Sequence, residues 1–257
     1  MSDSNLPLPP PPKGRGAVSN QDSTRFNMPA REWDGDWLDA RDSIDGQEQK
    51  LRTEVTAEFP KSIINFNISP DLPFDRSINA YRGCEHGCIY CYARPTHAYH
   101  DLSPGLDFET RLFAKPDAAE LLRQTFAKPT YQPASLAIGT NPDPYQPIEK
   151  RYRITRQILE VMLVSRHPVG ITTKSDRVLD DIDLLGRLAR LQLTAVAVSI
   201  TSLDNETARL LEPRAPSPQK RLHAVHRLHA AGIPVHVSIA PVVPGITDHE
   251  MEAIAEA

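Results

Sequence analysis

Tyr81-Arg82-Gly83-Cys84-Glu85-His86-Gly87-Cys88-Ile89-Tyr90-Cys91-Tyr92 is the stretch that decides the fold, and it holds every cysteine of this 257-residue chain. Three thiols at CxxxCxxC spacing indicate a shared ligand, because thiolates in proteins hold iron–sulfur clusters, zinc or each other. An odd number leaves one thiol unpaired in any disulfide scheme. Three ligands on a cluster of four irons leave one iron with an open coordination position, and an open position on a metal is where chemistry occurs.

The loop around the thiols fits a cluster. Gly83 and Gly87 permit positive φ and let backbone N–H groups approach the cluster sulfides. Such donors stabilise the negative charge and tune the reduction potential.

Two alternatives use the same cysteines. One is a redox pair of Cys88 and Cys91, which leaves Cys84 without a role. The other is a zinc site whose fourth ligand is a nearby histidine: His86, His97 or His100.

The run SINAYRGCEHGCIYCYARP (Ser77 to Pro95), with Tyr90 before the last cysteine, resembles the signature of the radical S-adenosylmethionine (SAM) superfamily. It is most similar to the spore photoproduct lyase-like branch, where tyrosine-arginine-glycine precedes the first cysteine and tyrosine-alanine follows the last. The resemblance implies that Cys84, Cys88 and Cys91 ligate a 4Fe–4S cluster whose open iron chelates SAM. An electron, from a donor of the flavodoxin or ferredoxin type, then cleaves SAM to a 5′-deoxyadenosyl radical that abstracts hydrogen from a substrate.

The resemblance also implies residues that contact the cofactor. Tyr90 is expected to face the adenine, and Asp143, in a loop similar to the branch's aspartate-proline-tyrosine-glutamine-proline segment, to contact SAM or substrate. Lys174 suits the SAM carboxylate and Ser175 a ribose hydroxyl. The remaining candidates, also at predicted strand ends, are Thr140, Ser199 and Arg214.

One feature departs from the branch. Spore photoproduct lyases use a further cysteine as hydrogen-atom donor, whereas all cysteines here belong to the cluster motif. Tyr92 or Tyr99 is expected to take that role, and lyase activity on thymine dimers is not carried over. The substrate is therefore unknown, with nucleic acid one candidate. The alternative function is a non-catalytic iron–sulfur or zinc protein, or an inactive fragment.

The pattern from residue 61 onward predicts an α/β fold with a parallel sheet, because short apolar runs alternate with helical stretches. Strands are expected at 77–82, 135–140, 168–174, 194–201 and 234–241, and helices at 117–126, 155–166, 180–191 and from Ser217 to Gly232. Thr247 and Glu250 form a capping-box pattern for a final helix. The radical SAM core resembles a partial (β/α) barrel of six units, so this barrel is expected to be truncated after its fifth strand.

Residues 1–60 are expected to form a separate extension, disordered, proline-rich and acidic, because Pro9 to Pro12 favour polyproline II and Lys13 to Gly16 form a flexible basic break. The net charge of −4 offers no overall basic field for nucleic acid. No stretch approaches the roughly 20 apolar residues that span a bilayer. Free cysteines and a beginning without a signal pattern favour the cytoplasm.

Overall fold

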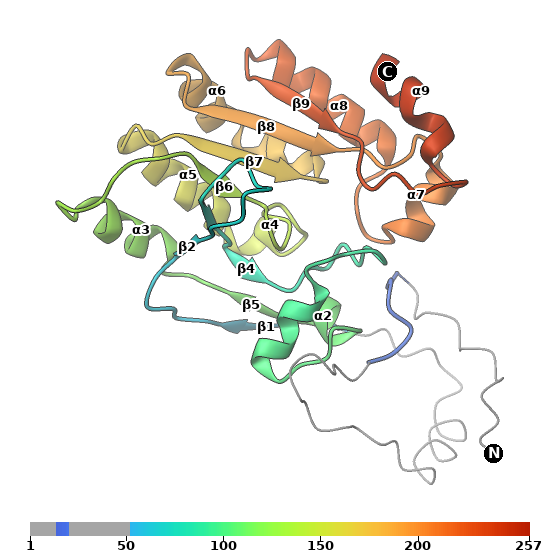
Figure 1. The fold of residues 1–257 in the computed structure, drawn as a ribbon, viewed down its shortest axis with the longest axis horizontal. Coiled ribbons are helices and arrows are strands. Elements are labelled where there is room, and N and C mark those ends of the chain that lie inside the picture. The colour runs from blue at the N-terminus through green and yellow to red at the C-terminus, as the bar shows by residue number, and fades with distance from the viewer. Residues whose placement is uncertain (1–13, 21–51) are drawn as a thin grey trace, which may run out of the picture.

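The computed structural model describes residues 14–20 and 52–257, which form a mixed α/β fold (Figure 1). The main sheet has six strands in the order β2-β3-β6-β7-β8-β9. All neighbouring pairs from β3 to β9 are parallel, and β2 is antiparallel to β3 at one edge. The strand bounds are β2 (Ile64–Phe66), β3 (Arg76–Ile78), β6 (Leu136–Ile138), β7 (Val169–Thr173), β8 (Thr194–Ser199) and β9 (Val235–Ser238).

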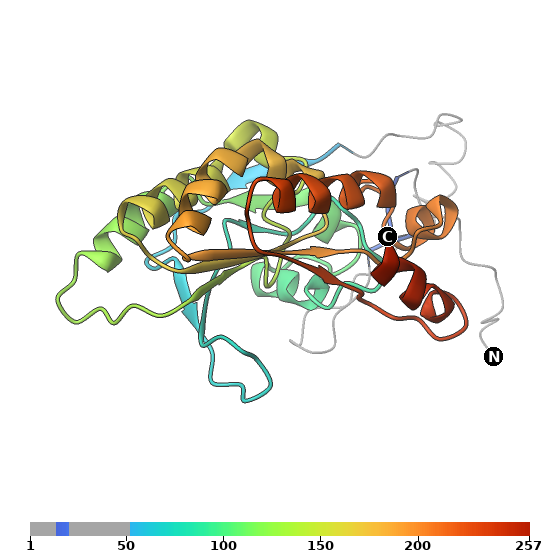
Figure 2. The same ribbon diagram turned by 90° about the horizontal axis from the view of Figure 1, so that it is seen from above.

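The helices that connect the parallel strands lie together along one face of this sheet (Figure 2). Each buries an apolar stripe against it; in α5, for example, Ile158, Leu159 and Met162 are fully buried. These helices are α3 (Ala118–Phe126), α5 (Ile154–Val164), α6 (Ile182–Arg190) and α8 (Pro218–Ala230). Shorter helices are η2 (Arg94–His100), α2 (Asp107–Thr110), α4 (Glu149–Tyr152), η3 (Asp176–Asp181), α7 (Asn205–Leu211), η4 (Asp248–Glu250) and α9 (Met251–Glu256).

The predicted parallel sheet is thus confirmed, with β3, β6, β7, β8 and β9 at the expected places and in chain order. The described sheet is open, with β2 and β9 at its two edges. The predicted strand at 77–82 is divided: Tyr81–Arg82 forms β4 of a second sheet. Partial-barrel closure stays an expectation.

The predicted capping box of the last helix is wrong. The Thr247 hydroxyl accepts a hydrogen bond from the Val243 N–H at 2.9 Å. The Glu250 carboxylate instead accepts from the Ser202 hydroxyl at 2.7 Å and the Leu203 N–H at 2.6 Å. Both side chains therefore fasten the segment after β9 and the loop after β8, rather than a helix end.

A second, three-stranded sheet has the order β1-β5-β4 and was not predicted. In it β1 (Glu54–Ala57) runs parallel to β5 (Arg111–Ala114), and β5 runs antiparallel to β4 (Tyr81–Arg82). The expectation that residues 1–60 are unpacked is therefore wrong for β1. Within the described residues 14–20, Arg15 is only 5% exposed. Residues 1–13 and 21–51 lie outside the described residues.

Among residues 14–20 and 52–257, none of the helices has the length and apolar composition of a membrane span.

The cysteine loop and α7 lie together beyond the carboxyl ends of the main-sheet strands (Figure 1), where the Ile89 N–H donates to the Leu211 carbonyl oxygen at 3.0 Å. In parallel sheets this is the edge at which ligands bind.

Candidate active site

The three cysteines share one tight loop that starts at the end of β4. Cys84 and Cys88 are buried, Cys91 is partly buried, and none forms a disulfide. Gly83 has a φ of 71°. A Cβ there would lie 2.7 Å from the Phe108 carbonyl oxygen, the same atom that accepts the Cys84 N–H at 2.9 Å. Only glycine allows this approach of the loop to α2.

The thiols are a donor set that fits a cationic cluster. Burial raises the pKa of Cys88 to about 12 and raises the pKa of Cys84 and Cys91 as well. Metal ligation requires the thiolate form, which burial disfavours. Positively charged iron at this position would favour the thiolates and so offset the effect of burial. Within the part of the chain that is described, no three His, Cys, Asp or Glu side chains gather around one point as a single ion would require. Thiolates of a cubane bind separate irons and need not meet at one point.

A buried polar network lies beside the loop and centres on Glu212, which sequence reasoning missed. Its carboxylate accepts hydrogen bonds from the Tyr90 hydroxyl, from Arg221 and, at 2.7 Å, from the Thr201 hydroxyl. Lys174 Nζ lies 3.4 Å from the same carboxylate and 5.6 Å from the centroid of the Tyr90 ring. Burial alone raises the pKa of Glu212, but the positive charges of Arg221 and Lys174 outweigh it and lower that pKa to about 2.

Asp143 joins the cysteine loop to the ends of β6 and β7. Its carboxylate accepts from the Thr173 hydroxyl and the Lys174 N–H, both at 2.7 Å, and from the Tyr145 N–H at 2.9 Å. It also lies 3.6 Å from Nδ1 of buried His86. These contacts hold the backbone that carries the Lys174 side chain.

Gln146, which the sequence analysis did not single out, connects the loop that contains Asp143 to the cysteine loop. Its amide accepts from the Glu85 N–H and donates to the Gly83 carbonyl oxygen, each at 3.0 Å. The loop that contains Asp143 is thus held to the cysteine loop at the residues before and after Cys84.

Three predicted cofactor residues are engaged by the protein itself. The Ser175 hydroxyl accepts from the Arg177 N–H and caps η3. Ser199 ends β8, is buried, and accepts from Arg221 through its carbonyl oxygen at 3.1 Å. Arg214 donates to Glu85 at 3.2 Å.

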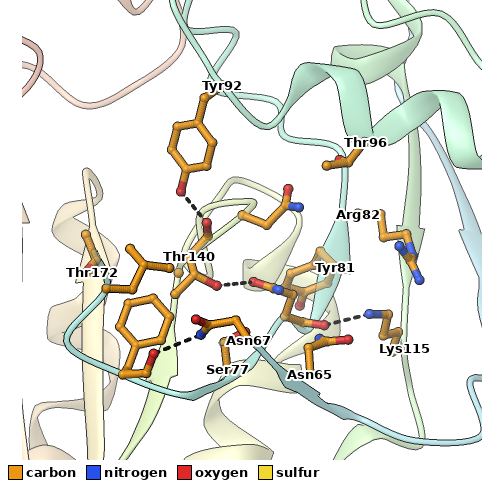
Figure 3. A pocket seen from close by; sticks show the side chains of 15 residues that line it. Asn65, Asn67, Ser77, Tyr81, Arg82, Tyr92, Thr96, Lys115, Thr140 and Thr172 are labelled. Atoms are coloured by element: carbon orange, nitrogen blue, oxygen red, sulfur yellow. Dashed lines mark hydrogen bonds between the residues drawn. The ribbon is translucent and has the colours of Figure 1, made fainter. Parts of the chain in front are cut away.

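A cavity of about 530 Å³ opens at the carboxyl ends of β3, β6 and β7 and is lined by Tyr92, the residue after the last cysteine (Figure 3). Tyr92 and Thr140 line it, and the Tyr92 hydroxyl donates to the Thr140 carbonyl oxygen. Lys115, only 4% exposed, reaches it and donates to the Asn79 carbonyl oxygen at 3.0 Å. Tyr99, on η2, is exposed and does not line the cavity. Amide side chains are prominent in the lining: Asn65, Asn67, Asn79 and Asn141.

A family model described as the radical SAM superfamily matches residues 78–257, which include the loop, the network and the cavity's strand ends. The chain belongs to the radical SAM superfamily. The superfamily uses a 4Fe–4S cluster and SAM in radical chemistry. Enzymes of this kind need an electron donor and a substrate.

Several relatives of this radical SAM protein carry the name uncharacterized protein. The uncharacterized protein Rv2578c of Mycobacterium tuberculosis is 41% identical over 177 residues, covering 69% of this chain and 52% of that protein. The uncharacterized protein MJ0683 of Methanocaldococcus jannaschii is 31% identical over 173 residues, covering 67% of this chain and 62% of that protein. The chain thus spans about half the length of the mycobacterial relative.

Solved structures of spore photoproduct lyase share the fold. A cysteine-to-serine mutant matches with a TM-score of 0.59 and 17% identity, covering 79% of this chain and 57% of that one. A double mutant with bound AdoMet and dinucleoside spore photoproduct matches with the same TM-score, identity and coverage. At this identity the likeness shows the fold alone.

Proposed function

We propose that Cys84, Cys88 and Cys91 hold the 4Fe–4S cluster of this radical SAM enzyme, and that the substrate occupies the cavity beside Tyr92. The observation that carries the proposal is that the three thiols share one loop whose Tyr90 is bonded to Glu212 and whose Tyr92 lines that cavity. When bound and reduced, a cluster held by these three cysteines would supply the electron for reductive cleavage of SAM to methionine and a 5′-deoxyadenosyl radical, the species that would abstract hydrogen from the substrate.

The protein's part at the SAM side is orientation. Tyr90 is fixed by its hydrogen bond to Glu212, which leaves a rigid ring face for the adenine. Lys174 is the cation poised for the SAM carboxylate, since Glu212 and the Tyr90 ring hold it next to the loop. Asp143 positions the Lys174 backbone, which is a supporting role rather than the direct contact expected from the sequence.

The protein's part at the substrate side is recognition through amides and enclosure. The Asn67 amide is bonded to Phe74 and Ser69, and the Asn79 amide oxygen accepts from Thr140. The amides of Asn65 and Asn141 at the same cavity suit a substrate with a hydrogen-bonding edge, such as a nucleobase, because an amide both donates and accepts. Tyr92, which follows Cys91 and lines the cavity, is preferred over Tyr99 as hydrogen-atom donor to the product radical. The electron donor is expected to be of the flavodoxin or ferredoxin type.

Iron and sulfide analysis tests the proposal. Protein reconstituted without oxygen should bind about four irons and four sulfides, and alanine at Cys84, Cys88 or Cys91 should abolish this. Stoichiometric zinc without labile sulfide would refute it in favour of the zinc-binding alternative. A full cluster in all three alanine variants would show that other residues hold the cluster.

A further inference from the structure

A short N-terminal segment, residues 14–20, lies directly against the cysteine loop although more than sixty residues separate them in the sequence. The Gly16 and Ala17 N–H groups donate to the two carboxylate oxygens of Glu109, at 3.0 and 2.9 Å. Glu109 is fully buried in α2. A buried carboxylate that accepts two backbone N–H groups makes strong, charge-assisted hydrogen bonds.

The same carboxylate connects the segment to a cluster cysteine. Arg94 Nη2 donates to Glu109 at 2.6 Å, and the Arg94 guanidinium also donates to the Cys88 carbonyl oxygen at 2.9 and 3.1 Å. The backbone of Cys88 is therefore connected to Gly16 through Glu109 and Arg94, by a path of three hydrogen bonds. None of these contacts involves the apolar core of the main sheet.

The backbone of residues 14–20 packs tightly against the backbone at Gly87 and at Gly105. A Cβ on Gly16 would lie 1.7 Å from the Gly87 carbonyl oxygen, inside the cysteine loop. A Cβ on Gly105 would lie 2.2 Å from the Ser19 carbonyl oxygen. The backbones pack so closely that only glycine fits at these positions.

A second chain of contacts reaches the other side of the loop. Arg15 donates to the Glu109 carbonyl oxygen at 2.7 Å and to the Thr53 hydroxyl at 3.2 Å. Thr53 in turn donates to the Glu85 carboxylate at 2.6 Å. Since Glu85 follows Cys84, the segment is connected to the loop beside both buried cysteines.

We infer that residues 14–20 are a clamp on the cysteine loop, with Arg15, Gly16 and Glu109 as positioning residues for cluster retention. The inference rests on the proposed function in taking the three cysteines as the cluster ligands. Through its contacts to Glu85, Gly87 and the Cys88 carbonyl oxygen, the clamp holds the backbone from Cys84 to Cys88 in the shape that the ligands require. The cluster site of this chain thus includes a segment far outside the cysteine motif.

The variant Gly16→Ala tests the clamp, because its methyl group meets the backbone of Gly87 and must displace the segment. Gly186→Ala on α6, where a Cβ meets nothing within 4 Å, is the matched control. The reconstituted Gly16→Ala protein should lose iron to a chelator about tenfold faster or more than wild type, since hydrogen bonds to charged groups are lost. Gly186→Ala should lose iron at the wild-type rate.

Hydrogen exchange of the metal-free protein gives a readout that does not depend on the cluster. Gly16→Ala should speed exchange of the amides at 84–91 and leave those of β7 and β8 unchanged. Unchanged exchange at 84–91 would overturn the clamp, and so would equal acceleration in β7 and β8, which would show general destabilisation. If wild-type protein binds no cluster, the proposed function fails while this exchange comparison still decides whether the segment orders the loop.

Discussion

Replacing Glu212 with glutamine removes the negative charge at the centre of the buried network. Arg221, only 2% exposed, then keeps its positive charge without an ionised partner. The pKa of Glu212 falls from 4.5 to about 2 in the folded protein, which corresponds to about 3 kcal/mol of stabilisation at neutral pH. Removal of one partner of a buried ion pair costs a similar amount, about 3–5 kcal/mol. The Glu212→Gln protein should therefore be less stable at pH 7 by about 3 kcal/mol.

The pH dependence of that difference has a defined sign. A depressed carboxyl pKa contributes stability that is complete above the unfolded value of 4.5 and is lost as pH falls towards about 2. Urea unfolding of both proteins, followed by circular dichroism at pH 7 and at several values below 4.5, measures the difference. It should be constant at neutral pH and shrink in acid.

The matched control is Glu120→Gln on α3, which removes an exposed carboxylate that pairs with Arg123 at 3.0 Å. Exposed pairs contribute little, so the control should unfold like wild type. If Glu212→Gln also unfolds like wild type at pH 7, or if the difference grows in acid, the network does not stabilise the site as we reason.

Three further predictions follow from the site's charges and backbone. Lys174→Ala should weaken SAM binding by roughly 1.5–3 kcal/mol, the range for a hydrogen bond to a charged group, as calorimetry would measure; unchanged affinity would remove Lys174 from the carboxylate site. Because burial lowers the pKa of Lys115 to about 8, wild-type stability relative to Lys115→Met should rise between pH 8 and 10.5, and a flat difference would show that Lys115 is not desolvated. Gly83→Ala, at a φ of 71°, should cost at least about 1–2 kcal/mol in urea unfolding, and wild-type stability would contradict the close approach to Phe108.

Local sequence signals predicted much of the main sheet and the site's central loop. The βα alternation placed β6, β7, β8 and β9 within a few residues, since each strand is a short apolar run with a helical stretch after it. Ser175 stays a predicted ribose contact, and the structure gives it a further role in capping a helix. Its position immediately before η3 is typical of a helix N-cap, and the hydroxyl is used as one.

The residues that were missed depend on contacts between distant segments. Glu212 lies two residues before the predicted Arg214, but its partners Tyr90 and Arg221 come from different parts of the fold. The role of Glu109 likewise depends on its contact with Gly16, which is distant in the sequence. The strands β1 and β5 have only four residues each, which is too short for a recognisable alternation of apolar and polar residues.

The central claim is that this loop and its network support reductive cleavage of SAM. The most direct measurement is the amount of 5′-deoxyadenosine formed when anaerobically reconstituted protein is given dithionite and SAM without substrate. We expect slow formation of 5′-deoxyadenosine with an equal amount of methionine, and none in the Cys88→Ala protein. A protein with a full cluster that leaves SAM intact would contradict the account and favour a non-catalytic iron–sulfur protein.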